Sequence, residues 1–204
     1  MKDIKVASVQ FEHAPGDKQA NLDKVRRFTA EAAEQGVELV VFPEMCITGY
    51  WFLRDLGRDE LLELSESVPD GATTQELLRL AKQHNLSLGA GLLEISDEGE
   101  MFNSYVVAMP NGRTVCHRKL HAFVSEHIVS GSDFTVFELP NGSRAAILIC
   151  YDNNLFENTR IVALGGGDID RAAPNRRLSD SEPALHGRDR SVTVARKAGK
   201  PRGD

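Results

Sequence analysis

Apolar and polar positions follow two different periods along most of the chain. Residues 4–11 (IKVASVQF) and 86–95 (LSLGAGLLEI) are dense in small and branched apolar side chains, which predicts strands. Residues 37–44 (VELVVFPE) are almost continuously apolar, as in a strand that is covered on both faces. Between the strands predicted at residues 4–11 and 37–44, residues 21–35 repeat apolar side chains at helical spacing, which predicts a helix that ends at Gly36. This strand, helix, strand order implies a parallel right-handed crossover.

The same two periods continue along the chain, and turn sequences such as DEGE and PNG separate the elements. Helices are predicted at residues 59–65, 74–84 and 155–166. A hairpin is predicted from strands at 101–109 and 113–121, and one more strand at 145–150. Together they predict a mixed α/β sheet with helices on its faces.

Composition narrows the class of protein. The 204 residues are 41% hydrophobic and 26% charged, which is ordinary for a soluble globular domain. No apolar run approaches the roughly 20 residues that span a bilayer, and the amino terminus lacks the apolar core of a signal peptide. We therefore expect a cytoplasmic protein with no membrane segment. The net charge of −6 argues against nucleic acid as a partner.

The last part of the chain differs in character. Residues 169–204 lose the apolar periodicity and become rich in arginine, proline and serine, which predicts a basic, disordered tail. Its many Lys and Arg side chains suggest, as one hypothesis, that the tail binds nucleic acid. The tail contains no aromatic residue, however, and a solvated tail is the preferred interpretation. We expect residues 1–168 to form the folded portion.

Three reactive residues fall at the carboxyl ends of predicted strands, where ligands gather in an open α/β sheet: Glu44, Lys119 and Cys150. A thiol at the junction of a buried strand and a turn can face a pocket while free backbone N–H groups point at what it attacks. A nearby carboxylate could take the thiol proton, and an ammonium could stabilise an oxyanion.

Each of these residues has a structural alternative. A lone cysteine at a strand end is often a small core side chain, a glutamate after proline is often a cap, and a lone lysine is usually solvated. Cys46 and Cys116 show no CxxC spacing with each other or with Cys150, so free thiols are expected. The three histidines near Lys119 match no strong metal motif and are interpreted as structural: His117, His121 and His127.

Taken in order with their flanks, the three segments resemble a known family. VVFPEMCITGY around Glu44, HRKLH around Lys119 and ILICYDNNLFENTR around Cys150 resemble the three signatures of the carbon–nitrogen hydrolases, the nitrilase and amidase superfamily. The resemblance runs from residue 4 to about Asp168. It implies an αββα sandwich, usually in a homo-oligomer, with no cofactor and no metal.

The resemblance also implies roles for individual residues. Cys150 would be the nucleophile, Glu44 the general base and acid, and Lys119 the stabiliser of the tetrahedral intermediate. The backbone N–H of Tyr151 would complete the oxyanion hole, and Glu126 is the candidate for a second glutamate that orients the lysine. The substrate would be a small amide, carbamoyl compound or nitrile, hydrolysed through a cysteine thioester. The absence of C-W-E at Cys150 favours an amide or carbamoyl group over a nitrile.

The resemblance stops abruptly near Asp168. Family members continue there through further strands and helices, whereas here GGDI is followed by a loss of apolar character. We therefore expect a truncation or a shift of reading frame after about residue 168, and a sandwich that is incomplete at its C-terminal end. The alternative function is a catalytically inactive family member that acts as an interaction module through an exposed sheet edge.

Overall fold

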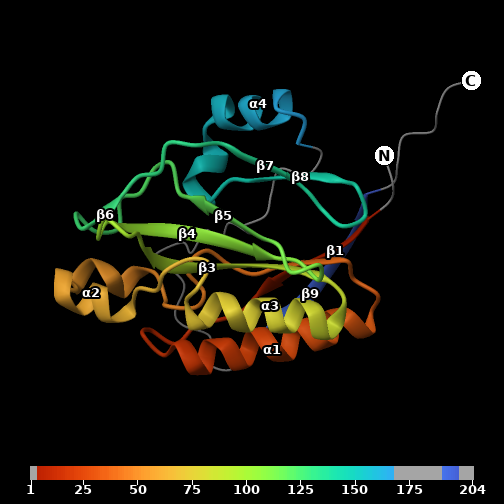
Figure 1. The fold of residues 1–204 in the computed structure, drawn as a ribbon, viewed down its shortest axis with the longest axis horizontal. Coiled ribbons are helices and arrows are strands. Elements are labelled where there is room, and N and C mark those ends of the chain that lie inside the picture. Colours follow the sequence, from red (N-terminus) through yellow and green to blue (C-terminus); the bar gives the residue numbers. More distant parts are fainter. Residues whose placement is uncertain (1–3, 168–189, 198–204) are drawn as a thin grey trace, which may run out of the picture.

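Two β-sheets lie face to face, and helices cover the outer face of each sheet (Figure 1). The computed structural model describes residues 4–167 and 190–197, and the side chains of the first range only. Within these residues the order of layers is helix, sheet, sheet, helix. The predicted αββα sandwich is confirmed.

The larger sheet contains seven strands in the described residues, in the order β5-β4-β3-β2-β1-β9, with β6 paired to β4. Strands β1, β2 and β3 are parallel, as the crossover pattern predicted, and β3, β4 and β5 are antiparallel. The strands of this sheet are β1 (Ile4–Gln10), β2 (Leu39–Val41), β3 (Ser87–Ile95), β4 (Met101–Ala108), β5 (Thr114–Arg118), β6 (Ile128–Val129) and β9 (Arg190–Lys197). The second sheet is the hairpin of β7 (Thr135–Glu138) and β8 (Arg144–Ile147).

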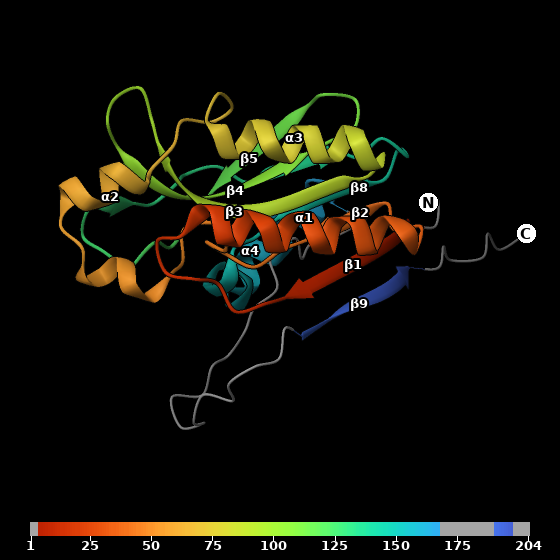
Figure 2. The ribbon, with the colours of Figure 1, turned by 90° about the horizontal axis from the view of Figure 1, so that it is seen from below.

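Four α-helices surround the sheets in the described residues: α1 (Lys18–Glu34), α2 (Arg58–Leu64), α3 (Ala72–His84) and α4 (Phe156–Leu164). Helices α1 and α3 lie side by side under the larger sheet (Figure 2). An ion pair between Arg26 and Glu76, 2.6 Å apart, joins these two helices. Among the described helices, none is both long and apolar enough to cross a bilayer.

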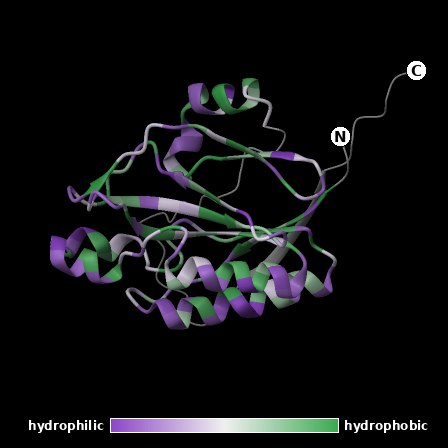
Figure 3. Ribbon diagram, in the orientation of Figure 1, coloured by the Kyte–Doolittle hydropathy of each residue, from purple (hydrophilic) through white to green (hydrophobic). Residues whose placement is uncertain are grey.

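Alternation along the strands explains how both faces of the larger sheet become buried. In β2 and the residue after it, Val40 and Phe42 pack against α1 and α3, whereas Leu39 and Val41 face the second sheet. A separate apolar cluster joins β8 to α4 through Ala146. The strands accordingly carry most of the hydrophobic colour in Figure 3, and the helices alternate hydrophobic and hydrophilic faces. Burial on both faces is the reason for the continuously apolar sequence around β2.

Strand β2 is shorter than the predicted strand over residues 37–44. Pro43 has no N–H to donate to the ladder, which ends regular pairing. The buried hydroxyl of Tyr105 lies 2.8 Å from the carbonyl oxygens of both Phe42 and Gly89. A Cβ atom at Gly89 would lie 2.6 Å from the Tyr105 ring, so glycine is required for this close approach. After Phe42 the regular strand has ended, and the chain leads through Pro43 to Glu44.

Part of the tail differs from its prediction. The expected disorder over residues 169–204 is wrong for Arg190–Lys197, where β9 pairs antiparallel with β1. The sequence SVTVA at positions 191–195 contains three consecutive β-branched residues, which suits a strand, and β9 pairs with the free edge of β1. The remainder of the tail, including the expected change of reading frame, lies outside the described residues.

The Tyr105 hydroxyl gives a prediction about stability. The Gly89 carbonyl keeps its hydrogen bond from the Phe42 N–H, but Tyr105→Phe removes the hydroxyl donor beside the buried Phe42 carbonyl. We expect it to lower the free energy of unfolding by about 1–3 kcal/mol. Urea denaturation measures this as a lower midpoint with an unchanged slope. Tyr50→Phe is the matched control, because the Tyr50 hydroxyl is also buried but has no hydrogen-bond partner in the described residues. An equal loss in both variants would contradict the assignment.

Candidate active site

Three segments that are distant in sequence bring Glu44, Lys119 and Cys150 together. Glu44 follows β2, Lys119 follows β5, and Cys150 follows β8 by two intervening residues. The Lys119 Nζ atom lies 2.6 Å from Glu44 Oε1, and the side chains are 0% and 10% exposed. This is a buried ion pair, so each charge compensates for the desolvation of the other.

Asn103 on β4 fixes both members of this pair. Its side-chain amide donates to Glu44 Oε1 at 2.7 Å, and its backbone carbonyl accepts from the Lys119 backbone N–H at 2.8 Å. The Lys119 ammonium also lies 5.4 Å from the centre of the Tyr50 ring and 4.8 Å from that of Phe123, where cation–π attraction adds to its stabilisation. Asn103 was missed from the sequence, because NSY within a strand carries no signal of a distant carboxylate.

Cys150 lies at a sharp turn rather than at the end of a regular strand. Strand β8 stops at Ile147, and Cys150 begins the 3₁₀ helix η2 (Cys150–Asn154) with φ of +47°. The left-handed region is unfavourable for a residue with a Cβ atom and occurs at sites where surrounding contacts hold it. The turn lifts the half-buried thiol out of the sheet and toward Glu44.

The surroundings keep this thiol protonated at neutral pH. Burial raises the pKa of Cys150, and the negative charge of Glu44 raises it further, to about 11. Glu44 also forms a hydrogen bond with the thiol, while the charge of Lys119 and the backbone N–H of Tyr151 act in the opposite direction. The carboxylate is therefore, after burial, a second reason that the thiol keeps its proton, and it is also the group placed to accept it.

The other two thiols lie in different environments. Cys46 is fully buried, and burial raises its pKa to about 12. Cys116 packs beside Glu94, and burial together with that carboxylate raises its pKa to about 12. Of the three cysteines, Cys150 is the one beside the Glu44–Lys119 pair, and none of the three forms a disulfide in the described residues.

Asp152 connects the Cys150 turn to the segment after Lys119. Its fully buried carboxylate accepts hydrogen bonds from the backbone N–H groups of Leu120, at 3.2 Å, and His121, at 3.0 Å. It also contacts Nδ1 of the His121 ring at 2.8 Å. Sequence reasoning missed this residue, although a carboxylate two positions after a candidate nucleophile was a signal that could have been followed.

The predicted site residues divide into two groups. The structure brings Glu44, Lys119 and Cys150 together with the backbone N–H of Tyr151, whose side chain is exposed. It does not bring Glu126 to them. Glu126 is exposed on the loop between β5 and β6, and it makes no hydrogen bond or ion pair with a described residue. That loop points the carboxylate to solvent, so the geometry offers no support for an orienting role.

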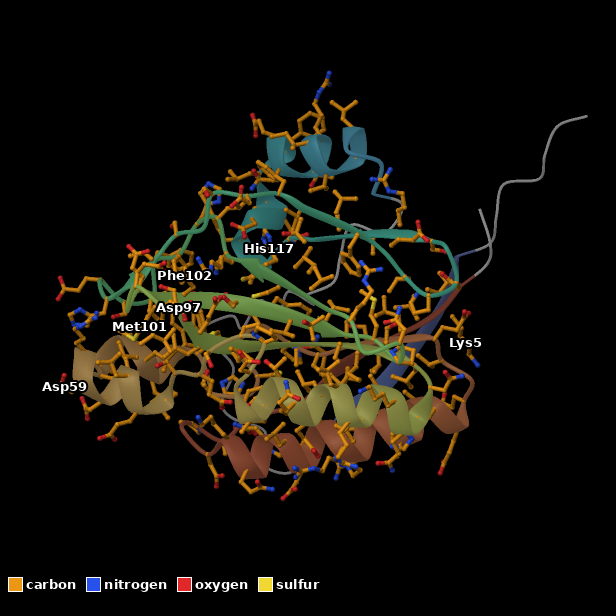
Figure 4. All side chains as sticks on the ribbon, in the orientation of Figure 1. Lys5, Asp59, Asp97, Met101, Phe102 and His117 are labelled. Atoms are coloured by element: carbon orange, nitrogen blue, oxygen red, sulfur yellow. The ribbon has the colours of Figure 1, made fainter. Side chains whose placement is uncertain are left out.

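The histidines do not assemble into a metal site. His117 on β5 lies between the two sheets (Figure 4), where its Nδ1 contacts Thr135 Oγ1 at 3.0 Å and burial lowers its pKa to about 4. Within residues 4–167 and 190–197, no group of three His, Cys, Asp or Glu side chains could hold a metal ion. A cavity of about 600 Å³ at the outer edge of β5 is lined in part by His117, and none of Glu44, Lys119 and Cys150 lines it.

Comparison with known proteins identifies the family of this chain. The carbon-nitrogen hydrolase family profile matches residues 5–193. The chain belongs to the carbon-nitrogen hydrolase family. The match passes beyond Asp168, where the recognisable motifs stop, and reaches into β9.

Curated relatives within this family carry amidase and nitrilase names. A nitrilase of Pyrococcus abyssi is 34% identical over 81% of this chain and 63% of its own length. An (R)-stereoselective amidase of Pseudomonas sp. is 32% identical over 81% of this chain and 58% of its own length. An omega-amidase of Xenopus tropicalis is 30% identical over 81% and 61%. The chain spans about three fifths of the length of these relatives.

Solved structures of the nitrilase superfamily share the fold. Nit3 of Saccharomyces cerevisiae superposes with a TM-score of 0.75 at 26% identity, covering 91% of this chain and 68% of that chain. A Nesterenkonia amidase superposes with a TM-score of 0.68 at 22% identity, over 83% and 65%. The family and the four-layer architecture are therefore shown by two independent comparisons.

The charge arrangement predicts how the thiol titrates. Glu44→Gln removes the negative charge that raises the Cys150 pKa and leaves Lys119 without its partner, so the pKa should fall. Alkylation by iodoacetamide should therefore shift to lower pH and become faster at pH 8, about tenfold for each unit of pKa. Intact mass and peptide mapping across a pH series measure this. Glu157→Gln, at an exposed acid on α4, should leave the profile unchanged. A shift to higher pH in Glu44→Gln would contradict the prediction.

Proposed function

We propose that this chain is a thiol hydrolase of non-peptide carbon–nitrogen bonds. Cys150 is the nucleophile, Glu44 transfers protons, and Lys119 together with the Tyr151 N–H stabilises the oxyanion. The single observation that carries the proposal is the buried Glu44–Lys119 pair beside the one thiol that is in contact with Glu44. The membership of the family supports it.

In the first half of the proposed reaction, the Cys150 thiol gives its proton to Glu44 as sulfur bonds to the substrate carbon. The electron pair of the carbonyl double bond moves to oxygen, which becomes the oxyanion. Once Glu44 is protonated, Lys119 has lost its anionic partner, and its ammonium can pair with the oxyanion instead. The intermediate collapses when Glu44 returns the proton to the nitrogen, and ammonia or an amine leaves a thioester on Cys150.

In the second half, water takes the place of the amine. Glu44 accepts a proton from the water as its oxygen attacks the thioester carbon, and the tetrahedral intermediate again faces Lys119 and the Tyr151 N–H. The carbon–sulfur bond then breaks, and the sulfur recovers a proton from Glu44. Every proton is accounted for by one carboxylate, and no cofactor takes part.

The proposed substrates are small amides or carbamoyl compounds in preference to nitriles. Cys150 is followed by Tyr151 and Asp152, where typical nitrilases have the Trp and Glu of C-W-E. Two of the relatives above are named as amidases. Self-association belongs to the same proposal, since Phe156 and Leu164 on α4 are 71% and 76% exposed and offer an apolar surface for it.

A second candidate function rests on that exposed apolar surface alone. In this case the chain is an inactive family member that binds a protein partner or a second copy through α4. It predicts association without turnover, whereas the hydrolase predicts both. Sedimentation measured beside an activity assay separates the two.

Ammonia release from a panel of amides, carbamoyl compounds and nitriles tests the proposed activity. We expect release from at least one amide or carbamoyl compound, loss of release in Cys150→Ala, and a decrease in kcat of about 10²–10⁴-fold in Glu44→Gln. The fall in turnover would coincide with the faster alkylation predicted above, which a merely unfolded variant would not show. Release that survives in Cys150→Ala would exclude Cys150 as the nucleophile. A folded chain that associates but releases no ammonia would favour the second candidate.

A further inference from the structure

We propose that Asp152 is a positioning residue that couples the Cys150 turn to the Lys119 segment and so sets the distance between nucleophile and ammonium. This inference rests on the proposed function. Asp152 takes no part in the bond changes, because its oxygens are occupied by N–H donors on both sides.

The donors come from two separate parts of the chain. Oδ1 faces the backbone N–H of His121, at 3.0 Å, and Nδ1 of its ring, at 2.8 Å. Oδ2 faces the backbone N–H of Leu120, at 3.2 Å, and that of Ile149, at 3.4 Å. One carboxylate therefore spans residues 120–121 and the residue immediately before Cys150. Since Asp152 is 0% exposed, these bonds replace the hydration that the carboxylate would have in water.

Other hydrogen bonds at the turn have a more local reach. Asn153 donates to the carbonyl oxygens of Leu148, at 2.9 Å, and Cys150, at 3.2 Å. Asn158 donates to the backbone carbonyl of Asp152 at 3.0 Å. These bonds hold the left-handed turn from within residues 148–158, whereas the Asp152 carboxylate crosses to the other segment. Asn153 and Asp152 can therefore be compared, because Asn153 shapes the turn whereas Asp152 couples the turn to the Lys119 segment.

The coupling has a measurable electrostatic consequence. Lys119 directly precedes the two backbone N–H groups that Asp152 holds, and its charge lowers the pKa of the Cys150 thiol. The other ionisable groups near the thiol are Glu44 and Tyr50, and the groups near Asp152 are His117, His121 and Tyr50. Releasing the Lys119 segment should weaken the effect of the ammonium and raise the thiol pKa.

Loss of the Asp152 charge by itself would act in the opposite direction. A carboxylate near a thiol disfavours the thiolate, so its simple removal lowers the thiol pKa and speeds alkylation. A positioning role predicts slower alkylation. The sign of the change therefore separates the two roles without any assumption about magnitude.

The experiment compares Asp152→Asn with wild type across a pH series of iodoacetamide alkylation, followed by peptide mapping of Cys150. We expect alkylation at pH 8 to fall on the order of tenfold, with the profile displaced to higher pH. Asn153→Ala is the matched control from the same turn, and it should slow alkylation less than Asp152→Asn at equal thermal stability. Alkylation that is unchanged or faster in Asp152→Asn, or slowed equally in Asn153→Ala, would overturn the proposal.

If Asp152→Asn does not fold, His121→Ala provides a second test of the same proposal. It removes the ring contact to Oδ1 and leaves all three backbone bonds, and we expect a smaller decrease in the same direction. No decrease in that variant would overturn the proposal. Fast labelling of the buried Cys46 identifies an unfolded sample. Wild-type Cys150 that labels as in denatured protein would refute the proposed function and this inference together, whereas a normal wild-type profile that Asp152→Asn leaves unchanged would refute the inference alone.

Discussion

The buried ion pair between Glu44 and Lys119 is the interaction on which the arrangement of the site depends. A single charge at either position would carry a desolvation cost of several kcal/mol without compensation. The pair can form only if the ends of β2 and β5 meet, although β3 and β4 lie between them in the sheet. Asn103 closes that gap from β4, because its amide contacts the carboxylate and its carbonyl holds the lysine backbone.

Burial and the ion pair together set the resting state of the thiol. Burial raises the pKa of Cys150 most, and the charge of Glu44, which is shared between Lys119 and Cys150, raises it further. In the proposed reaction, transfer of that proton neutralises Glu44 and frees the charge of Lys119 at the moment when an oxyanion forms. A protonated resting thiol is thus consistent with nucleophilic chemistry, because activation and oxyanion stabilisation follow from the same proton transfer.

The second sheet brings the nucleophile to this pair. Apolar side chains of β7 and β8 pack against the inner face of the larger sheet, and the chain leaves β8 at the level where Glu44 and Lys119 lie. The left-handed conformation of Cys150 is unfavourable by itself. The Asn153 and Asn158 amides donate hydrogen bonds around it, and the Asp152 carboxylate accepts one from the Ile149 N–H. Strain at one residue is therefore offset by a dense local network.

The sequence by itself predicted the helices and most strands of the larger sheet, and it placed three candidate residues at strand ends. The αββα architecture was implied by the family resemblance, and β6, β7 and β9 were not predicted. Periodicity over α1 and β3 is local and strong, and Glu44, Lys119 and Cys150 each follow a strand, where a sheet gathers functional groups. It did not predict Asn103 or Asp152, because their partners lie 59 and about 30 residues away and are backbone groups or a carboxylate that only folding brings near. The family resemblance suggested Glu126 as a site residue because it follows Lys119 closely in sequence. The path of the loop between β5 and β6 instead leaves Glu126 exposed. The pairing of β9 with β1 likewise depends on a free strand edge, and tertiary structure alone decides which edge is free.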